Sequence, residues 1–276
     1  MLYKPLADCI LHAHSVGIDT SITTNGVLFT DAFARRVFLA ERLRWIKVSI
    51  NAGTPDTYAA IHRTRPQDFD RVLRNLEAAV KVRAEIGSRC TIGAQMIALP
   101  ETSGASKLRP LVRETYPSNI PTAEPLARRL RDVGIDYLVI KPYSQHLKSE
   151  RTRIYESTSY ADADAWASGL EALSSPGFDV VVRYHTMATK DASDRGYDRC
   201  HATPYHWAYV EADGEVWGCS TYLGRVKDGV TYGDDRFRFG NPSWRCGAGS
   251  GARRTGITFE RSWTSRSAGR TAGCTT

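Results

Sequence analysis

The chain has 276 residues, of which 42% are hydrophobic and 24% are charged, as in an ordinary soluble globular protein with a substantial core. No apolar run approaches the roughly eighteen residues of a membrane-spanning helix. The N-terminal segment also lacks the basic leader, apolar stretch and cleavage site of a signal peptide. We therefore expect a cytoplasmic protein without a membrane partner.

The net charge of +7 is unevenly distributed along the chain. Residues 242–276 contain six Arg, one Glu and no Lys or Asp, so this segment carries five of the seven excess positive charges. The remainder is nearly neutral and lacks the broad basic surface typical of nucleic-acid-binding proteins. We expect no nucleic-acid partner.

Helical and strand patterns alternate through the first two thirds of the chain. Apolar residues at helical spacing, several followed by Gly, predict helices, and short β-branched or apolar runs predict strands. The predicted helices are Lys4–Val16, Asp31–Leu43, Pro55–His62, Phe69–Ile86, Glu124–Val133 and Ala161–Leu173. The predicted strands are Ile18–Thr24, Trp45–Ile50, Cys90–Leu99, Tyr137–Lys141 and Phe178–Tyr184, and the polar segment Glu150–Ser159 is predicted to be a loop. Repeated strand–helix units predict an α/β fold with a parallel sheet, either open or closed as a barrel.

The composition changes near Gly196. Residues 200–241 have no helical periodicity, and their short aromatic and β-branched runs are separated by Asp-Gly pairs, which predicts a small hairpin-rich module. From Pro242 the chain is dominated by Gly, Ser and Thr with scattered Arg. The predicted organisation is therefore an α/β domain at 1–190, a small module at 196–241 and an irregular tail at 242–276.

The six cysteines are widely spaced, which favours buried thiols or metal ligands over a disulfide framework in a cytosolic chain. Cys200 and Cys219 lie in the hairpin-rich module, with Gly214 between them at an Asp-Gly turn. Three interpretations remain open for this pair. They are two buried thiols, ligands of an iron–sulfur cluster, or part of a zinc site completed by His201 or His206.

Three segments carry a family resemblance through their order and spacing. They are ITTNG at Ile22–Gly26, WIKVSINAGTPDTYAAIHRT at Trp45–Thr64, and FDRVLRNLEAAVKVR from Phe69. Together they resemble the middle of the radical S-adenosylmethionine (SAM) barrel. The pattern Cys-x13-Gly-x4-Cys from Cys200, followed by Phe-Gly-Asn at 239–241, resembles the opening of the SPASM auxiliary-cluster domain.

The resemblance implies a partial radical SAM (β/α) barrel at 1–190 and a truncated SPASM-like module at 196–241. It implies binding of SAM and of [4Fe–4S] clusters for radical modification of a peptide or small metabolite, with flavodoxin or ferredoxin as reductant. The implied metal ligands are Cys200 and Cys219, an incomplete set for an auxiliary iron–sulfur cluster. The implied cofactor-binding residues are Thr24, Asn25, Ser49, Asn51, Arg63 and Gln95. Strand termination and turn capping account for Ser49 and Asn51 equally well, and turn formation alone could account for Thr24 and Asn25. A solvated position at a helix end is the commoner one for an arginine such as Arg63.

The catalytic Cys-x3-Cys-x2-Cys loop of that family is missing, because no two cysteines lie close enough in the chain. We therefore expect an inactive protein whose start lies after the first two barrel strands, and we assign no catalytic residue. A shifted reading frame after Asn241 spells family-like residues in the tail, so a frameshift is predicted there; the alternative is a natural disordered basic tail.

Two other functions remain open from the sequence. The first is a non-catalytic α/β-barrel binding protein with a structural metal at Cys200 and Cys219. The second is a metal-free α/β-barrel enzyme, although no nucleophile motif or paired carboxylates with suitable spacing occur. Lys141, Pro142 and Tyr143 end a predicted strand and are expected to line a substrate region.

Overall fold

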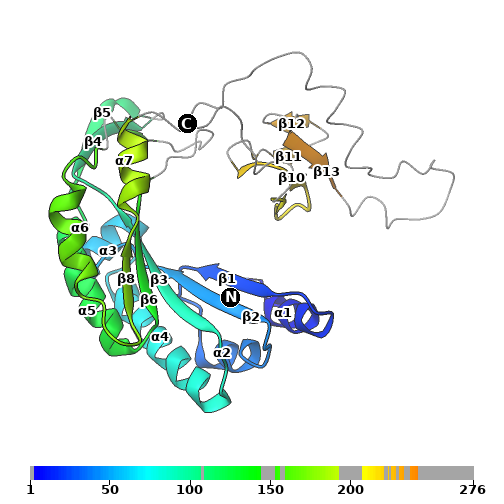
Figure 1. Cartoon of the computed structure of the whole chain (residues 1–276). Helices are drawn as coiled ribbons and strands as arrows, with labels where there is room; N and C mark the ends of the chain where they lie inside the picture. Colours follow the sequence, from blue (N-terminus) through cyan, green and yellow to red (C-terminus); the bar gives the residue numbers. More distant parts are fainter. Residues whose placement is uncertain are drawn as a thin grey trace. The chain divides into compact units, whose positions relative to one another are not determined.

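The computed structural model describes most of the chain and divides it into two compact units. The first unit comprises residues 1–144 and 153–196, and the second comprises 145–152 and 197–276. The described residues are 3–106, 109–143, 153–155, 159–192, 207–220, 223, 225–227, 230–232 and 237–241. Each unit is described by itself (Figure 1).

A five-stranded parallel sheet forms the centre of the first unit, in the spatial order β1-β2-β3-β6-β8. The strands follow one another in space in the same order as in the chain, so the sheet grows in one direction only. This is the strand order of a barrel wall and is compatible with a partial barrel. The strands are β1 (Thr20–Thr24), β2 (Leu43–Ser49), β3 (Thr91–Ala98), β6 (Tyr137–Pro142) and β8 (Asp179–Val182).

The helices of this unit lie on one side of the sheet. Parallel strands need crossover connections, and right-handed crossovers between successive neighbours place the connecting helices on the same face. In Figure 1 the strands line the inner side of a curved layer and the helices cover its outer side. The helices are α1 (Leu6–Ser15), α2 (Asp31–Val37), α3 (Pro55–His62), α4 (Gln67–Ile86), α5 (Ala123–Val133), α6 (Ala163–Glu171) and α7 (Tyr184–Ala192), with a short 3₁₀ turn at Ile120–Thr122.

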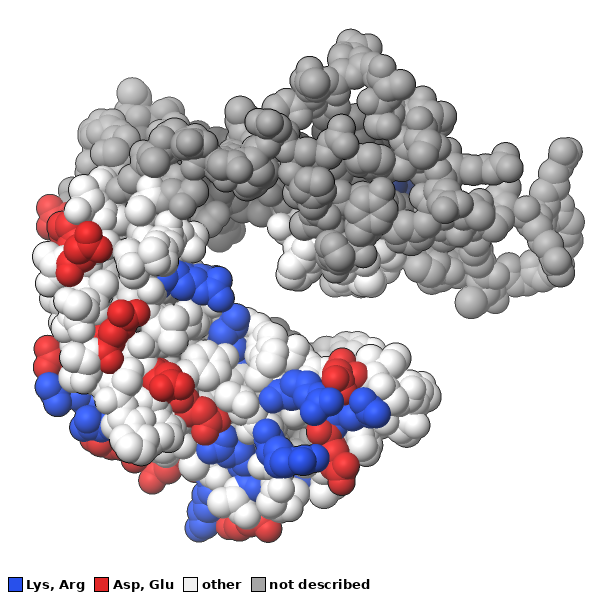
Figure 2. Space-filling view, in the orientation of Figure 1, with Lys and Arg blue, Asp and Glu red and all other residues white. Residues whose placement is uncertain are grey.

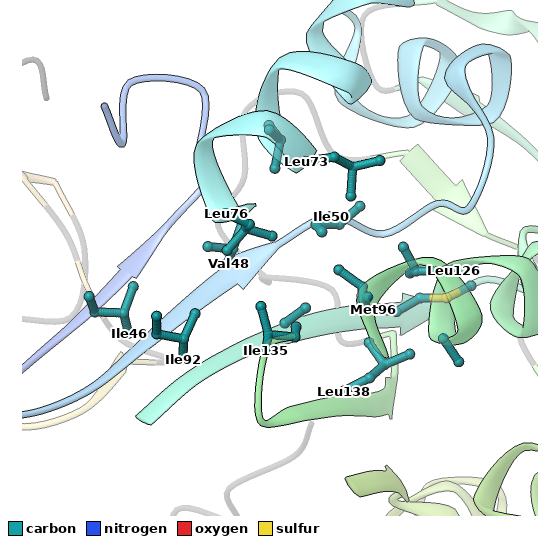
Figure 3. Close-up of a cluster of buried hydrophobic side chains, with 14 of the residues drawn as sticks. Ile46, Val48, Ile50, Leu73, Leu76, Ile92, Met96, Leu126, Ile135 and Leu138 are labelled. Carbon is teal, nitrogen blue, oxygen red and sulfur yellow. The ribbon is translucent and has the colours of Figure 1, made fainter. Parts of the chain in front are cut away.

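The core lies between the helices and alternate residues of the strands. Strand residues at a period of two point to the same face, and in β2 and β3 one of these sets is almost fully buried. Each large aliphatic side chain removed from water contributes about 1.5–3 kcal/mol. Figure 3 shows the centre of this core, formed by Ile46, Val48, Ile50, Leu73, Leu76, Ile92, Met96, Leu126, Ile135 and Leu138.

Helix α4 is the longest helix and covers the middle of the sheet. Its buried residues recur at intervals of three and four, which makes one continuous apolar stripe. The helix ends at Gly87, whose backbone adopts the left-handed conformation (φ 72°) and donates to the Ala84 carbonyl. A glycine adopts this conformation without the steric cost that a Cβ would add. The predicted stop of this helix at Gly87 is therefore confirmed.

An ion pair fastens the amino ends of β3 and β6 to α4. The Asp136 carboxylate accepts the Ile92 amide (2.6 Å) and pairs with the guanidinium of Arg83, which also donates to the Cys90 carbonyl (3.1 Å). The Asp136 amide in turn donates to the Ile92 carbonyl (2.8 Å). One carboxylate therefore holds the start of two strands and one helix together.

The predicted α/β fold with a parallel sheet is confirmed, with differences at the ends of some elements. The helix predicted at Asp31–Leu43 ends at Val37, because Leu43 is buried as the first residue of β2. Strand β8 ends at Val182, and Tyr184 begins α7 instead of ending a strand.

The sequence patterns missed an antiparallel sheet of the first unit, in the order β5-β4-β7. Its strands are β4 (Thr102–Ser106), β5 (Arg109–Tyr116) and β7 (Arg153–Tyr155). The last of these lies within Glu150–Ser159, so the prediction that this segment is entirely loop is wrong. Its short, polar composition gave no strand signal, since antiparallel pairing is decided by the partner strand.

The second unit contains the predicted hairpins. Strands β9 (Tyr209–Val210), β10 (Val216–Trp217) and β13 (Arg238–Gly240) form an antiparallel sheet, and β11 (Arg225–Lys227) pairs with β12 (Val230–Tyr232). An Asp-Gly turn joins β9 to β10, closed by the Gly214 amide donating to the Glu211 carbonyl (2.9 Å). Buried Glu215 accepts from Arg238 (2.5 Å) beside the fully buried Trp217. Hairpin-rich structure is thus confirmed here.

Replacing Asp136 with Ala should lower the free energy of unfolding by about 1–3 kcal/mol, because the Ile92 amide and the Arg83 guanidinium lose their shared acceptor. Urea unfolding followed by circular dichroism measures the change. Asp132→Ala is the matched control, since the Asp132 side chain is 71% exposed and its one ion pair among the described residues is the 3.7 Å contact with Arg131. Equal stability of the two variants would contradict this role for Asp136.

Candidate functional site

The inner face of the parallel sheet carries a set of polar and cationic residues that the core does not use. In β2 and β3 the residues that alternate with the core positions point to this face. Residues that are register partners on neighbouring strands form a row, or level, across this face. The central level consists of Ser49, Gln95 and Val139, on β2, β3 and β6. Lys47 lies one level nearer the amino ends, and Lys141 one level nearer the carboxyl ends. The carboxyl ends of parallel strands are where α/β proteins place their ligand sites.

Ser49 and Gln95 are brought together by the pairing of β2 with β3. The Gln95 side-chain amide donates to the Ser49 hydroxyl (3.5 Å), and Gln95 is only 6% exposed. The Gln95 carbonyl accepts the amides of Ile50 (3.0 Å) and Asn51 (3.4 Å), so pairing continues past the end of β2. These two predicted site residues therefore share one place on the inner face.

Asn51 holds the turn that follows β2. Its backbone is left-handed (φ 59°), a conformation that asparagine tolerates better than most residues. Its side-chain oxygen accepts the Ile97 amide (2.8 Å), and its carbonyl accepts the side-chain amide of Asn119 (2.7 Å). The side-chain oxygen of Asn51 thus joins the end of β2 to β3, and its carbonyl joins it to Asn119.

Asn119 is the centre of this fastening, and the sequence patterns did not single it out. The residue is fully buried, and its side chain donates to the Asn51 and Ile97 carbonyls (2.7 and 2.8 Å) and accepts the Leu99 amide (2.7 Å). A buried asparagine with all of these bonds satisfied fixes the backbone around it. An Asn in a Pro- and Ser-containing loop looks like an ordinary turn residue, so no sequence signal could have found it.

The segment between Asn119 and α5 also lies against Gly53, which follows the end of β2. The Gly53 amide donates to the Thr122 hydroxyl (2.9 Å), and that hydroxyl donates to the Asn119 carbonyl (2.7 Å). A Cβ on Gly53 would lie 1.9 Å from the Thr122 carbonyl oxygen, which belongs to the backbone. The absence of a side chain at Gly53 is therefore required for this close approach.

The remaining predicted cofactor residues lie in turns and at a helix end. The Thr24 hydroxyl accepts the Gly26 amide and the Asn25 side chain accepts the Val27 amide, both at 3.2 Å. Asn25 is exposed, and Thr24 is level with buried Val48 on the helix-covered side. Arg63 is exposed, with a left-handed backbone (φ 52°) at the end of α3. The structure therefore joins Ser49, Asn51 and Gln95 at one edge and leaves Arg63 outside that group.

His62 supports the same edge from α3. Its Nε2 donates to the Ile50 carbonyl (2.6 Å), and its ring stacks on Tyr58 with ring centroids 4.3 Å apart. Burial lowers the pKa of His62 below its ordinary value, and the bond to the Ile50 carbonyl opposes this shift in part. His62 is thus a neutral donor that holds the end of β2.

Three cationic residues gather on the inner face. Burial, followed by the charges of Lys47 and then Arg183, lowers the pKa of the Lys141 ammonium. The ammonium of Lys47 lies 5.1 Å from the centroid of the Trp45 ring on the same face of β2, a cation–π contact. Figure 2 shows Lys and Arg side chains, in blue, along the hollowed side of the first unit. We call Lys47, Lys141 and Arg183 the cationic cluster.

The described cysteines offer no metal centre. Cys200 lies outside the described residues, while Cys219 is half-buried in the second unit. Within the described ranges, no group of three or more His, Cys, Asp and Glu side chains is placed to hold a metal ion. Burial raises the pKa of the Cys90 thiol to about 12, so Cys90 stays protonated at neutral pH. The interpretation as a buried thiol is therefore correct for Cys90.

Comparisons with known proteins give little further information. No protein-family model and no curated protein matches the chain. Among solved structures, 2,3-dimethylmalate lyase, a PEP mutase/isocitrate lyase superfamily member, is similar in two crystal forms. Both share 13% identity over 67% of this chain and have a TM-score of 0.21, covering 75% and 73% of their own chains. These values do not establish a shared family.

The interpretation as a radical SAM protein with a SPASM-like iron–sulfur domain is wrong by these findings. No family model matches the chain, and the described residues hold no group of metal ligands. The Thr-Asn-Gly and Ser-Ile-Asn segments that carried the resemblance have local roles here, in turn formation and strand pairing. The predicted frameshift after Asn241 falls outside the described residues, and cofactor binding stays a prediction.

No helix in the described part of the chain combines the length and apolar character needed to cross a bilayer.

Replacing Asn119 with Ala should lower the free energy of unfolding by about 3 kcal/mol or more, because three buried backbone groups lose their partners. The control is Asn25→Ala, which removes one exposed turn bond and should cost less than about 1 kcal/mol. Both are measured by urea unfolding. A loss at Asn119 no larger than that at Asn25 would show that the network does not hold this edge.

The lowered pKa of His62 predicts a pH dependence of stability. The unfolded chain binds a proton at the ordinary histidine pKa near 6.5, whereas the folded protein resists this proton. The contribution of neutral His62 to the free energy of unfolding is therefore fully present above the ordinary histidine pKa. It is lost as the pH falls towards the lower pKa of the folded state. Between pH 7 and pH 5, the unfolding free energy should fall more steeply for the wild type than for His62→Gln; parallel curves would contradict this.

Proposed function

We propose that the chain is an α/β-barrel-type protein that binds an anionic small molecule on the inner face of its parallel sheet. The ligand carries a phosphate or carboxylate group, and Lys47, Lys141 and Arg183 attract it. The observation that carries the proposal is the gathering of these like charges on one sheet face. This choice keeps the non-catalytic binding function foreseen from the sequence and leaves out its structural metal, for which the described residues offer no ligand group.

The register of the sheet supports a single site. Ser49 and Gln95 occupy the level between the level of Lys47 and that of Lys141, so two neutral polar residues lie between two lysines along the register. Arg183 follows the end of β8, where its amide donates to the carbonyl of Ile140, the residue before Lys141 (2.9 Å). Arg183 is therefore adjacent to Lys141 along the carboxyl edge of the sheet.

In the described part of the chain, no carboxylate forms an ion pair with Lys47 or Lys141, the lysines of the cluster. By contrast, Arg35, Arg36 and Arg42 of the same unit each pair with a carboxylate. Like charges held together in a half-buried place are unfavourable, and a bound anion would relieve their repulsion.

The site is also stiff. The network of Asn119 and Asn51 fixes the ends of β2 and β3, and the helix-covered side of both strands is fully packed. Residues on a rigid scaffold keep their positions before the ligand arrives, which lowers the entropic cost of binding. This stiffness favours a site for a specific small molecule over a diffuse charged surface.

Isothermal titration calorimetry with pyrophosphate tests the proposal. The wild type should bind, and Lys47→Gln and Lys141→Gln should each weaken binding roughly tenfold, the loss of one charged hydrogen bond. Lys81→Gln on the exposed side of α4 is the matched control and should leave the affinity unchanged. Absence of binding, or equal losses in the three variants, would refute an anion site at this face.

The lowered pKa of Lys141 sets the expected pH dependence of this binding. As the pH rises above neutral, Lys141 loses its proton before an ordinary lysine does, so the affinity for pyrophosphate should start to fall at a lower pH than an ordinary lysine would set. The fall should be absent from Lys141→Gln over the same range. The measurement is the same titration repeated between pH 7 and pH 10, and identical profiles would contradict the assignment to Lys141.

A further inference from the structure

We propose that Lys141 forms an imine with a small aldehyde or ketone that also carries an anionic group. The proposal rests on the anion site described above and adds a covalent reaction to it. Lys141 supplies the amine, while Lys47 and Arg183 bind the anionic group of the same molecule. The proposed ligand class is therefore that of oxo acids and phosphorylated carbonyl compounds.

The backbone around Lys141 is held firmly. Lys141 lies in β6, opposite Ile97 of β3, and is followed by the buried Pro142. Just beyond, the Tyr143 amide donates to the Tyr160 hydroxyl (2.7 Å), which donates to the Ala98 carbonyl (2.7 Å). Tyr160 is 3% exposed, so this link between the ends of β3 and β6 is buried. The side chain of Lys141 therefore extends towards a bound carbonyl from a backbone whose position is fixed.

The surroundings of Lys141 favour the neutral amine. The charged groups that act on it are Lys47 on β2 and Arg183 after β8, both cations, and burial acts in the same direction. Within the described residues no carboxylate pairs with Lys141 to restore the ammonium form. Only a neutral amine attacks a carbonyl carbon, and desolvation next to another cation is a known way to activate a lysine.

The reaction needs no further reagent. The Lys141 nitrogen attacks the carbonyl carbon, and its electron pair forms the new carbon–nitrogen bond while the carbonyl oxygen takes up a proton. The resulting carbinolamine then loses its hydroxyl group together with the remaining nitrogen proton as water, which leaves a carbon–nitrogen double bond. One water is released for each imine formed, and nothing is oxidised or reduced.

Reductive trapping tests the proposal on the wild-type protein. Pyruvate with sodium cyanoborohydride at neutral pH converts an imine into a stable secondary amine, and peptide mass spectrometry locates it. Lys141 should be labelled at least roughly tenfold faster than the exposed Lys81, because the proposed anion site holds the carbonyl compound next to the Lys141 amine. Acetone, which has the carbonyl without the carboxylate, should label Lys141 less than pyruvate does.

Two further measurements separate this proposal from the anion site. Pyrophosphate should suppress labelling of Lys141 and leave labelling of Lys81 unchanged, because it occupies the same cations. Lys141→Arg removes the amine and keeps a positive charge, so the fast labelling phase should disappear in this variant; Lys81→Arg should keep that phase.

Labelling of Lys141 at the rate of Lys81, in protein that binds pyrophosphate, would overturn the imine and leave the anion site standing. Fast labelling that pyrophosphate does not suppress would overturn the shared site. Failure of pyrophosphate to bind in calorimetry would refute the anion site itself, independently of any labelling.

Discussion

Packing of α4 and α5 against alternate residues of β2 and β3 is the interaction on which the rest of the structure depends. Ile46, Val48, Ile92 and Met96 are fully removed from water on that side. Because side chains alternate along a strand, this burial also decides which residues face the other way. A register shift of one residue would bury Lys47 and Ser49 under the helices, at a cost that no other contact of the strand would offset.

The polar face is a consequence of that packing, and its details come from the loops. Asn119 reaches across from the segment after the antiparallel strands and holds the ends of β2 and β3 through backbone groups. Gly53 permits the close approach that the same network needs. These contacts make the carboxyl edge rigid where the cationic cluster begins, so a structural network and a candidate binding site share one edge.

The short motifs of the sequence were informative about structure and misleading about family. Thr24 to Gly26 does form a turn after a strand, and Asn51 does end one, as the patterns indicated. Such segments recur wherever a parallel strand leads into a crossover, because the same turn chemistry is needed in many unrelated α/β proteins. Their order therefore predicted the strand–helix alternation, while their chemistry did not establish the family.

The sequence by itself determined the parallel α/β unit, most helix ends and the hairpins of the second unit, since these follow from local periodicity and turn residues. It also placed Ser49 and Asn51 at the end of one strand and Gln95 on the next strand. Lys47 and Lys141 are 94 positions apart in the chain, and only the tertiary structure decided that their charges act on one another. The register across three strands sets how far apart the two residues lie in space. The same holds for Asn119, whose partners are separated from it in sequence and meet only when the sheet is formed.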